Sequence, residues 1–366
     1  MPDLRLVPPE PLQRFIRQIF RAMGADQDVA VEVANHLIRS NLSGHDSHGV
    51  MRMAQYVRQF DSGILAPSAR PVVTRQAAGT AVIDAQRGVG QFSTVFALEW
   101  AMRCAEENGI AAATIRHSTH IGRLGEYSEK VADKGFVTMI TAGAAGLGVG
   151  GIAPWGGRER FLAPSPWAFG VPVAGGAPVV FDAAMSTVAQ SKVKVANDKG
   201  QQLPPDCITD TEGNPSTHPP DFYAGGTLVP LGGQVAGHKG SGLALVAALL
   251  GGLGMIGDPD PSLIGAAIRD DSADARGRIS GVFLVVVNPA CFGDAASYQA
   301  MAAETLGMMK SVSPRSPEGE ILAPGEWELR NRERRRREGI PLPDVTCREL
   351  TEIGERLDLD VPHVLS

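Results

Sequence analysis

A histidine, a serine and an arginine lie close together in the stretch GHDSHGVMRM, residues 44–53. A histidine that stays neutral near pH 7 can accept a proton, and a guanidinium can bind a carboxylate through two parallel hydrogen bonds. Oxidation of a 2-hydroxy acid needs both groups, because the hydroxyl proton must leave while the carboxylate is held. The stretch therefore predicts His48 as an acid/base group, with Ser47 beside it, and Arg52 as a carboxylate ligand.

The same stretch has the composition of a helix start. Asp46 or Ser47 can cap the helix, which would place His48 in the first turn, near unpaired backbone N–H groups. The positive end of the helix dipole disfavours an imidazolium by about 0.3–1 kcal/mol, so it would help to keep the histidine neutral. Arg52 lies four residues further on and would share a helix face with His48.

A second H-x-x-H pair, His117 and His120, lies in RHSTHIGRLGEY. His120 falls between a predicted strand and a predicted helix, where functional side chains are often displayed, whereas nothing distinguishes His117 from a structural residue. Together with His45 and His48, the two pairs also suggest an alternative, a four-histidine metal hydrolase. Neither pair is HExxH and no cysteine lies nearby, so we predict no metal site.

Two glycine-rich segments could suggest a dinucleotide-binding loop. GLGMIG, residues 252–257, spells G-x-G-x-x-G, but it follows an apparent helix instead of a strand, and DPDP comes next. AGAAGLGVGG, residues 142–151, does follow a strand, but a proline and two more glycines come after it and oppose a helix. Neither segment has the strand–loop–helix context of a Rossmann fold.

Hydrophobic periodicity separates the chain ends from the middle. Residues 10–60 and the segment after 292 have helical spacing. The strand-like segments are 80–85, 110–116, 136–142, 178–183 and 281–287, with helical stretches near 93–108, 122–134 and 239–251. The pattern predicts an α/β (α+β) protein in which helices from both termini, 1–73 and 290–366, form one bundle domain. A β-rich domain, 74–289, would be inserted between them.

Composition limits the classes of partner. The chain has 366 residues, enough for two domains, and a net charge of −6, which argues against nucleic acid. Its one basic run, residues 330–339, is interrupted by glutamates and predicts a solvated helix face. The apolar segment GLALVAALLGGLGMIG is too short for a membrane span. Four widely separated cysteines and an N-terminus without an apolar signal core favour the cytoplasm.

Five motifs occur in an order that resembles the type 2 malate/L-lactate dehydrogenase family. They are DSHGV followed by an arginine, S-x-HIG, FDAAMS, GHKGSGLAL and LAPGE. This family includes ureidoglycolate, sulfolactate and diketogulonate dehydrogenases and cyclic-imine reductases. The resemblance implies a non-Rossmann NAD(P)-binding fold, NAD or NADP as cofactor, a small carboxylate substrate and a homodimer.

The resemblance also implies residue roles. The family's catalytic positions fall on Ser47, His48, His120 and Asp182, and its carboxylate-binding arginine on Arg52. Cofactor contacts fall on Asp182, Ala183, Ala184, Met185, Ser186, His238, Lys239, Pro324, Gly325 and Glu326. A lysine among glycines at a helix start would suit a phosphate.

Three departures affect the expected contacts. Members often have Asn-Pro where this chain has Ser165-Pro166, and Asp where it has His218; a serine found after the 136–142 strand in several members is missing. The sequence thus predicts an NAD(P)-dependent interconversion of a 2-hydroxy acid and its 2-oxo acid. The alternative is NADPH-dependent reduction of a cyclic imine carboxylate, which needs the same carboxylate ligand and proton donor.

Overall fold

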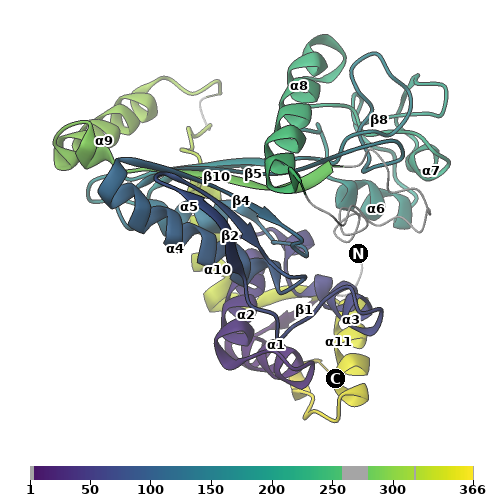
Figure 1. The fold of residues 1–366 in the computed structure, drawn as a ribbon. Coiled ribbons are helices and arrows are strands. Elements are labelled where there is room, and N and C mark those ends of the chain that lie inside the picture. The colour runs from purple at the N-terminus through teal and green to yellow at the C-terminus, as the bar shows by residue number, and fades with distance from the viewer. Residues whose placement is uncertain (1–3, 258–278, 317–318, 366) are drawn as a thin grey trace.

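The computed structural model describes residues 4–257, 279–316 and 319–365. Helices from the two chain ends lie together on one side of a large twisted sheet, and further helices and loops cover the rest of it (Figure 1). The mixed α/β class predicted from the sequence is confirmed.

Four helices near the chain ends share one apolar core: α1 (Pro9–Ala22), α2 (Gln27–Leu42), α3 (Met53–Asp61) and α11 (Asp344–Arg356). α10 (Glu326–Glu338) packs against α2, and the residues that it buries are polar, Asn331 and Arg332. The core includes Phe15 and Ile19 of α1 and Leu350 of α11, because apolar residues at helical spacing turn one face of each helix inward. The chain ends also pair through β1 (Leu4–Val7) and β11 (Ile340–Pro343), an antiparallel ribbon that the sequence did not predict.

Among the described residues, the central sheet has seven strands in the order β2-β3-β4-β10-β5-β6-β7, and β3 and β4 are the only neighbours of these that run parallel. All five predicted strands are present; β2 and β6 were not predicted. The bounds are β2 Val72–Ala77, β3 Thr80–Asp84, β4 Ile110–Arg116, β5 Val137–Ala145, β6 Trp167–Val171, β7 Val179–Ala183 and β10 Ile279–Val287.

Helices cover both faces of this sheet. α4 (Gly90–Asn108) and α5 (Leu124–Ala132) lie on one face, and α8 (Gly233–Gly252) lies on the other (Figure 1). α8 approaches the strands closely: a Cβ on Gly143 would stand 2.3 Å from the α8 backbone, and one on Gly251 would stand 2.5 Å from the backbone of β10. Gly143 of one candidate nucleotide loop, and Gly251 directly before the other, therefore allow the helix to pack closely on the sheet.

A third apolar cluster lies beside α8. It includes residues of α6 (Gln190–Asp198), α7 (Pro219–Tyr223) and the short strand β8 (Ile208–Thr209), which pairs with β9 (Pro215–Ser216). At the other end of the sheet, α9 (Ala295–Ser311) extends away from the core and buries none of its residues (Figure 1). Among the described residues, no helix combines the length and apolar character needed to cross a membrane.

Candidate active site

The structure brings the two histidine motifs together. His48 and His120 lie 72 positions apart in the chain, yet their rings stack with centroids 5.7 Å apart and an interplanar angle of 22°. His48 comes from a short turn between α2 and α3, and His120 from the loop that follows β4. Both residues lie below the protein surface, surrounded by protein, but each keeps some exposed area, so a small molecule can still reach the pair.

The segment around His48 is not the helix start that its composition predicted. Residues 46–48 and 50–52 form two successive 3-10 turns, and the α-helix begins only at Met53. Neither N-cap residue, His45 or Gly49, makes a side-chain capping hydrogen bond. Instead, the Ser47 hydroxyl lies 3.0 Å from His48 Nδ1, and Arg52 Nε donates to the Ser47 carbonyl over 2.6 Å. Arg52 also donates to Gln55, so Ser47, His48 and Arg52 form one compact unit.

A buried asparagine determines the shape of these turns. Asn41 Oδ1 accepts from Val50 N over 2.9 Å, and its amide nitrogen donates to Asp46 over 2.7 Å. Asp46 also accepts two hydrogen bonds from Arg335 of α10, at 2.8 and 3.1 Å. A Cβ on Gly49 would stand 2.1 Å from Asn41 Oδ1, so only glycine fits between the turns without displacing the asparagine.

Burial keeps both site histidines neutral. It lowers the pKa of His48 from 6.5 to about 3, and the positive charge of Arg52 lowers it further. The pKa of His120 is also well below its usual value, again because of burial first and Arg52 second. The predicted neutral state is thus supported, but the helix dipole is not its cause, because His48 precedes the α-helix.

Two side chains behind His120 were not predicted. The hydroxyl of Tyr56, in α3, lies 2.9 Å from His120 Nδ1, and Gln91 of α4 donates to the same hydroxyl over 2.5 Å. Neither residue belongs to a recognisable motif. The sequence pattern around each of them predicts only a helix that packs in the core.

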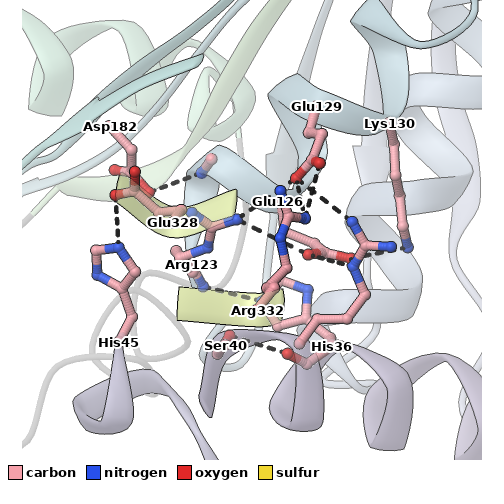
Figure 2. Close-up of polar contacts among 12 residues, drawn as sticks. His36, Ser40, His45, Arg123, Glu126, Glu129, Lys130, Asp182, Glu328 and Arg332 are labelled. Atoms are coloured by element: carbon pink, nitrogen blue, oxygen red, sulfur yellow. Dashed lines mark hydrogen bonds and ion pairs between the residues drawn. The ribbon is translucent and has the colours of Figure 1, made fainter. Parts of the chain in front are cut away.

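Asp182, the residue before the last one of β7, lies close to the start of α5, which follows the loop that carries His120. Its Oδ2 accepts from the Gly125 N–H over 2.7 Å (Figure 2). Burial raises the pKa of this carboxyl group, while the nearby Arg123 guanidinium opposes the rise. On the same side, His45 contacts Glu328 of α10, with 2.9 Å between Nε2 and Oε1 (Figure 2).

A buried ion-pair network fixes α2, α5 and α10 beneath this site. Arg39 of α2 contacts Glu126 over 2.7 Å, and Arg332 of α10 contacts Glu129 over 2.7 Å (Figure 2). Arg332 is 6% exposed. The basic run is therefore not simply a solvated helix face: two of its arginines, Arg332 and Arg335, turn inward, because acidic groups of α5 and of the His48 turn lie opposite them.

The predicted cofactor segments lie next to one another. The 183–186 segment begins at the last residue of β7 and contacts the residues that precede α8, since Leu231 N donates to the Met185 carbonyl over 2.9 Å. The next residue continues this pairing, because Thr187 N donates to the Val229 carbonyl over 2.9 Å. Pro324 pairs with β7, since its carbonyl accepts from Val180 N over 3.1 Å. Residues far apart in sequence therefore gather at one edge of the sheet.

Two details of these segments correct the sequence interpretation. α8 begins at Gly233, so His238 and Lys239 lie exposed in its second turn and not at its start. Glu326 contacts Lys310 over 2.5 Å and Arg330 over 2.6 Å, and these partners lower its pKa to about 2. Its carboxylate is thus engaged within the protein, and acceptance from a ribose hydroxyl would require it to exchange partners.

The four histidines of the metal alternative do not converge. His45 pairs with Glu328, and His117 Nδ1 lies 3.0 Å from Asp84. Within residues 4–257, 279–316 and 319–365, no group of three or more His, Cys, Asp or Glu side chains is arranged to hold a metal ion.

Comparison with known proteins agrees with the motifs. The sequence profile of the malate/L-lactate dehydrogenase family matches residues 7–351. Hydroxycarboxylate dehydrogenase B of Escherichia coli K12 is 33% identical over 349 residues, 94% of this chain and 93% of that protein. The delta(1)-pyrroline-2-carboxylate/delta(1)-piperideine-2-carboxylate reductase of Pseudomonas putida is 31% identical over 95% of this chain and 96% of its own length.

Solved structures show the same relationship. The malate dehydrogenase of Pyrococcus horikoshii OT3 superposes with a TM-score of 0.85 and 26% identity over 99% of each chain. With a family profile that spans nearly the whole sequence and relatives of full length, this chain belongs to the malate/L-lactate dehydrogenase family of oxidoreductases.

Proposed function

We propose that this protein interconverts a small 2-hydroxy acid and its 2-oxo acid with NAD or NADP. One observation carries the proposal: two neutral histidines stack 5.7 Å apart beside an arginine that is joined to one of them through Ser47. A neutral imidazole can take the hydroxyl proton, and a guanidinium can hold the carboxylate that distinguishes a 2-hydroxy acid from a simple alcohol.

In the oxidation direction, Arg52 would bind the carboxylate and orient the C2 hydroxyl toward the histidine pair. The bound nicotinamide would supply the hydride acceptor. His48 would receive the hydroxyl proton at Nε2 while its Nδ1 keeps the contact with Ser47. Asp182 and the loop before α5 would close the other side of the substrate.

The residues present fit a dinucleotide. Ser165, at φ +39°, has a buried hydroxyl with no hydrogen-bond partner among the described atoms, and the neighbouring Pro164 carbonyl accepts from Met185 of the 183–186 segment. Next to this segment is an open cavity of about 680 Å3, lined by Thr187, Lys192 and the glycine pair that starts α8. We propose that the cofactor occupies this edge of the sheet without a Rossmann loop, with Lys239 near its phosphates.

Kinetics of histidine variants test the assignment. His48→Ala should lower kcat by roughly 10²–10⁴, the usual range for loss of a general acid/base. His363→Ala removes an exposed histidine near the chain end and serves as the matched control, with an expected kcat near wild type. An unchanged kcat in His48→Ala, with turnover abolished in His120→Ala, would transfer the proton-carrying role to His120.

Reduction of a cyclic imine carboxylate is the second candidate. It is favoured by the relationship to the Pseudomonas putida reductase, and it would use the same arginine and the same proton donor. Parallel assays of 2-oxo acids and cyclic imine carboxylates with NADH and with NADPH separate the two candidates and identify the cofactor. The four-histidine hydrolase has no such support.

We also propose that two copies of the chain associate. The exposed face of α8 is apolar, with Leu243, Leu245, Val246 and Leu249 each more than 40% exposed, and α9 buries nothing within its own chain. Such faces are rare on monomers and common between subunits. Light scattering at micromolar concentration should give twice the chain mass, and Leu249→Glu should shift it toward one chain. A cytoplasmic location remains a proposal, consistent with four free cysteines.

The domain boundaries stay a proposal as well: a bundle of residues 1–73 and 290–366, and an inserted cofactor domain of residues 74–289, part of which lies outside the described residues. The shared core of the terminal helices supports the bundle. α9, although it falls in the C-terminal segment, lies apart from that core (Figure 1).

A further inference from the structure

The hydroxyl of Tyr56 contacts the face of His120 that a substrate cannot reach. It lies 2.9 Å from Nδ1, and both Tyr56 and Gln91 have no exposed surface. An imidazole has only two nitrogens, so this contact leaves Nε2 as the atom that can meet a substrate.

The direction of the hydrogen bonds follows from the partners. Gln91 donates its amide N–H to the Tyr56 oxygen over 2.5 Å, and the tyrosine proton then points to His120 Nδ1. An Nδ1 that accepts a hydrogen bond carries no proton, so the single proton of the neutral ring must lie on Nε2.

We propose that Tyr56, oriented by Gln91, is a positioning residue that holds the proton of His120 on Nε2. This inference rests on the proposed function and deepens it. With its proton on Nε2, His120 can donate a hydrogen bond to the C2 oxygen of a substrate, but it has no lone pair there to accept the hydroxyl proton. The acceptor in the oxidation direction is therefore His48.

Ser47, the hydrogen-bond partner of His48 Nδ1, differs from Tyr56 in a way that fits His48 as the proton acceptor and His120 as the donor. Ser47 is only partly buried, and its hydroxyl can rotate to accept from Nδ1–H or to donate to Nδ1. When Ser47 accepts, the Nε2 lone pair of His48 is available for the proton. The Tyr56 hydroxyl has no such freedom, because its oxygen accepts a hydrogen bond from Gln91 and its proton is left to point to His120 Nδ1. Burial also raises the pKa of Tyr56 to about 12, so its hydroxyl stays protonated.

The tautomer can be observed without any substrate. In protein labelled with 15N-histidine, two-bond 1H–15N correlation spectra distinguish Nε2–H from Nδ1–H rings, and the His120 signals are those that disappear in His120→Ala. Wild type should show His120 as the Nε2–H form. Tyr56→Phe should move the Nδ1 resonance, because the hydrogen bond accepted there is lost, and Gln91→Leu should move it in the same direction by less.

Tyr127→Phe is the matched control. Tyr127 is also fully buried, and its hydroxyl donates to the Ile121 carbonyl, so the variant loses a buried hydrogen bond without contacting the His120 ring. Its Nδ1 resonance should stay at the wild-type position. In turnover assays, Tyr56→Phe should lower kcat by about 3- to 10-fold and leave KM within about twofold, as expected for one lost hydrogen bond that orients the ring.

An Nδ1–H ring in wild type, or an unmoved Nδ1 resonance in both Tyr56→Phe and Gln91→Leu, would overturn the inference. These readouts do not depend on the reaction. A protein that oxidises no hydroxy acid but shows the predicted tautomer would refute the proposed function and leave the role of Tyr56 on the ring intact.

Discussion

Replacing Gly49 with alanine should disturb the site without touching a reacting group. Gly49 has φ −92°, which alanine adopts freely, so the effect is steric and not a matter of backbone strain. The added Cβ would lie 2.1 Å from Asn41 Oδ1, and an ordinary contact begins at 3.4 Å. Either Asn41 or the turn must therefore move by about 1.3 Å.

That movement breaks the bonds that hold the two turns. Asn41 would lose its contacts to Val50 N and Asp46, each with a net contribution of about 0.5–1.5 kcal/mol, and the buried Val50 N–H would be left without an acceptor, which costs about 1–3 kcal/mol. We expect Gly49→Ala to lower the free energy of unfolding by about 2–4 kcal/mol. His48 and Arg52 flank the site of the clash, and a displacement of about 1 Å can reduce kcat/KM by roughly 10²-fold.

A double-mutant cycle isolates the clash. In Asn41→Ala the two bonds are already lost and space is available, so adding Gly49→Ala should cost little more than Asn41→Ala alone. The coupling should be about 2 kcal/mol or larger, measured by urea unfolding. Gly307→Ala, in exposed α9 with nothing within 4 Å of the new Cβ, is the control and should not destabilise the protein. Additive effects in the cycle, or a fully active Gly49→Ala, would refute this reasoning.

Three further outcomes are expected. Lys239→Ala should raise the Kd for NAD(P)H, measured by fluorescence titration, more than it lowers kcat; an unchanged Kd would remove the lysine from the cofactor site. The pKa values of His36, His48 and His120 are all lowered by burial, so the unfolded state binds more protons once the pH falls below about 6.5. Stability should thus be level above about pH 7 and fall on acidification, by up to about 1.4 kcal/mol per pH unit for each histidine, and a melting temperature that rises between pH 7 and 5 would contradict this. Arg335→Met should lower kcat severalfold by loosening the His48 turn, and kinetics equal to wild type would show that the turn holds its shape without α10.

Patterns of neighbouring residues predicted the helices and strands whose formation depends on which face they bury. The apolar spacing of α1 and the continuous apolar run of β10 survive in the structure because each reflects which face an element buries. The pairing of the two histidine motifs depended on family resemblance, since no local signal indicates that residues 72 positions apart share a site.

The contacts that were missed are long-range. Arg335 reaches Asp46 across 289 positions, and it looked like part of a solvated run because charge patterning does not reveal what lies opposite a helix. The helix start predicted at Asp46 failed because Asn41 and Arg335 occupy the groups that would have capped it. Lys239 was placed at a helix start because the glycines before it were read as a loop, whereas tight packing of α8 accommodates them within the helix.

The central claim is that Arg52 holds a carboxylate while His48 exchanges a proton with the neighbouring oxygen. The most direct test compares the initial rate of reduced-cofactor consumption with a 2-oxo acid and with its neutral, isosteric amide, in wild type and in Arg52→Ala. Wild type should prefer the acid by at least about tenfold, the effect of one charge-assisted contact of about 1.5–3 kcal/mol, and the variant should lose most of that preference. Equal rates with acid and amide in wild type, or a preference that persists undiminished in Arg52→Ala, would contradict the account.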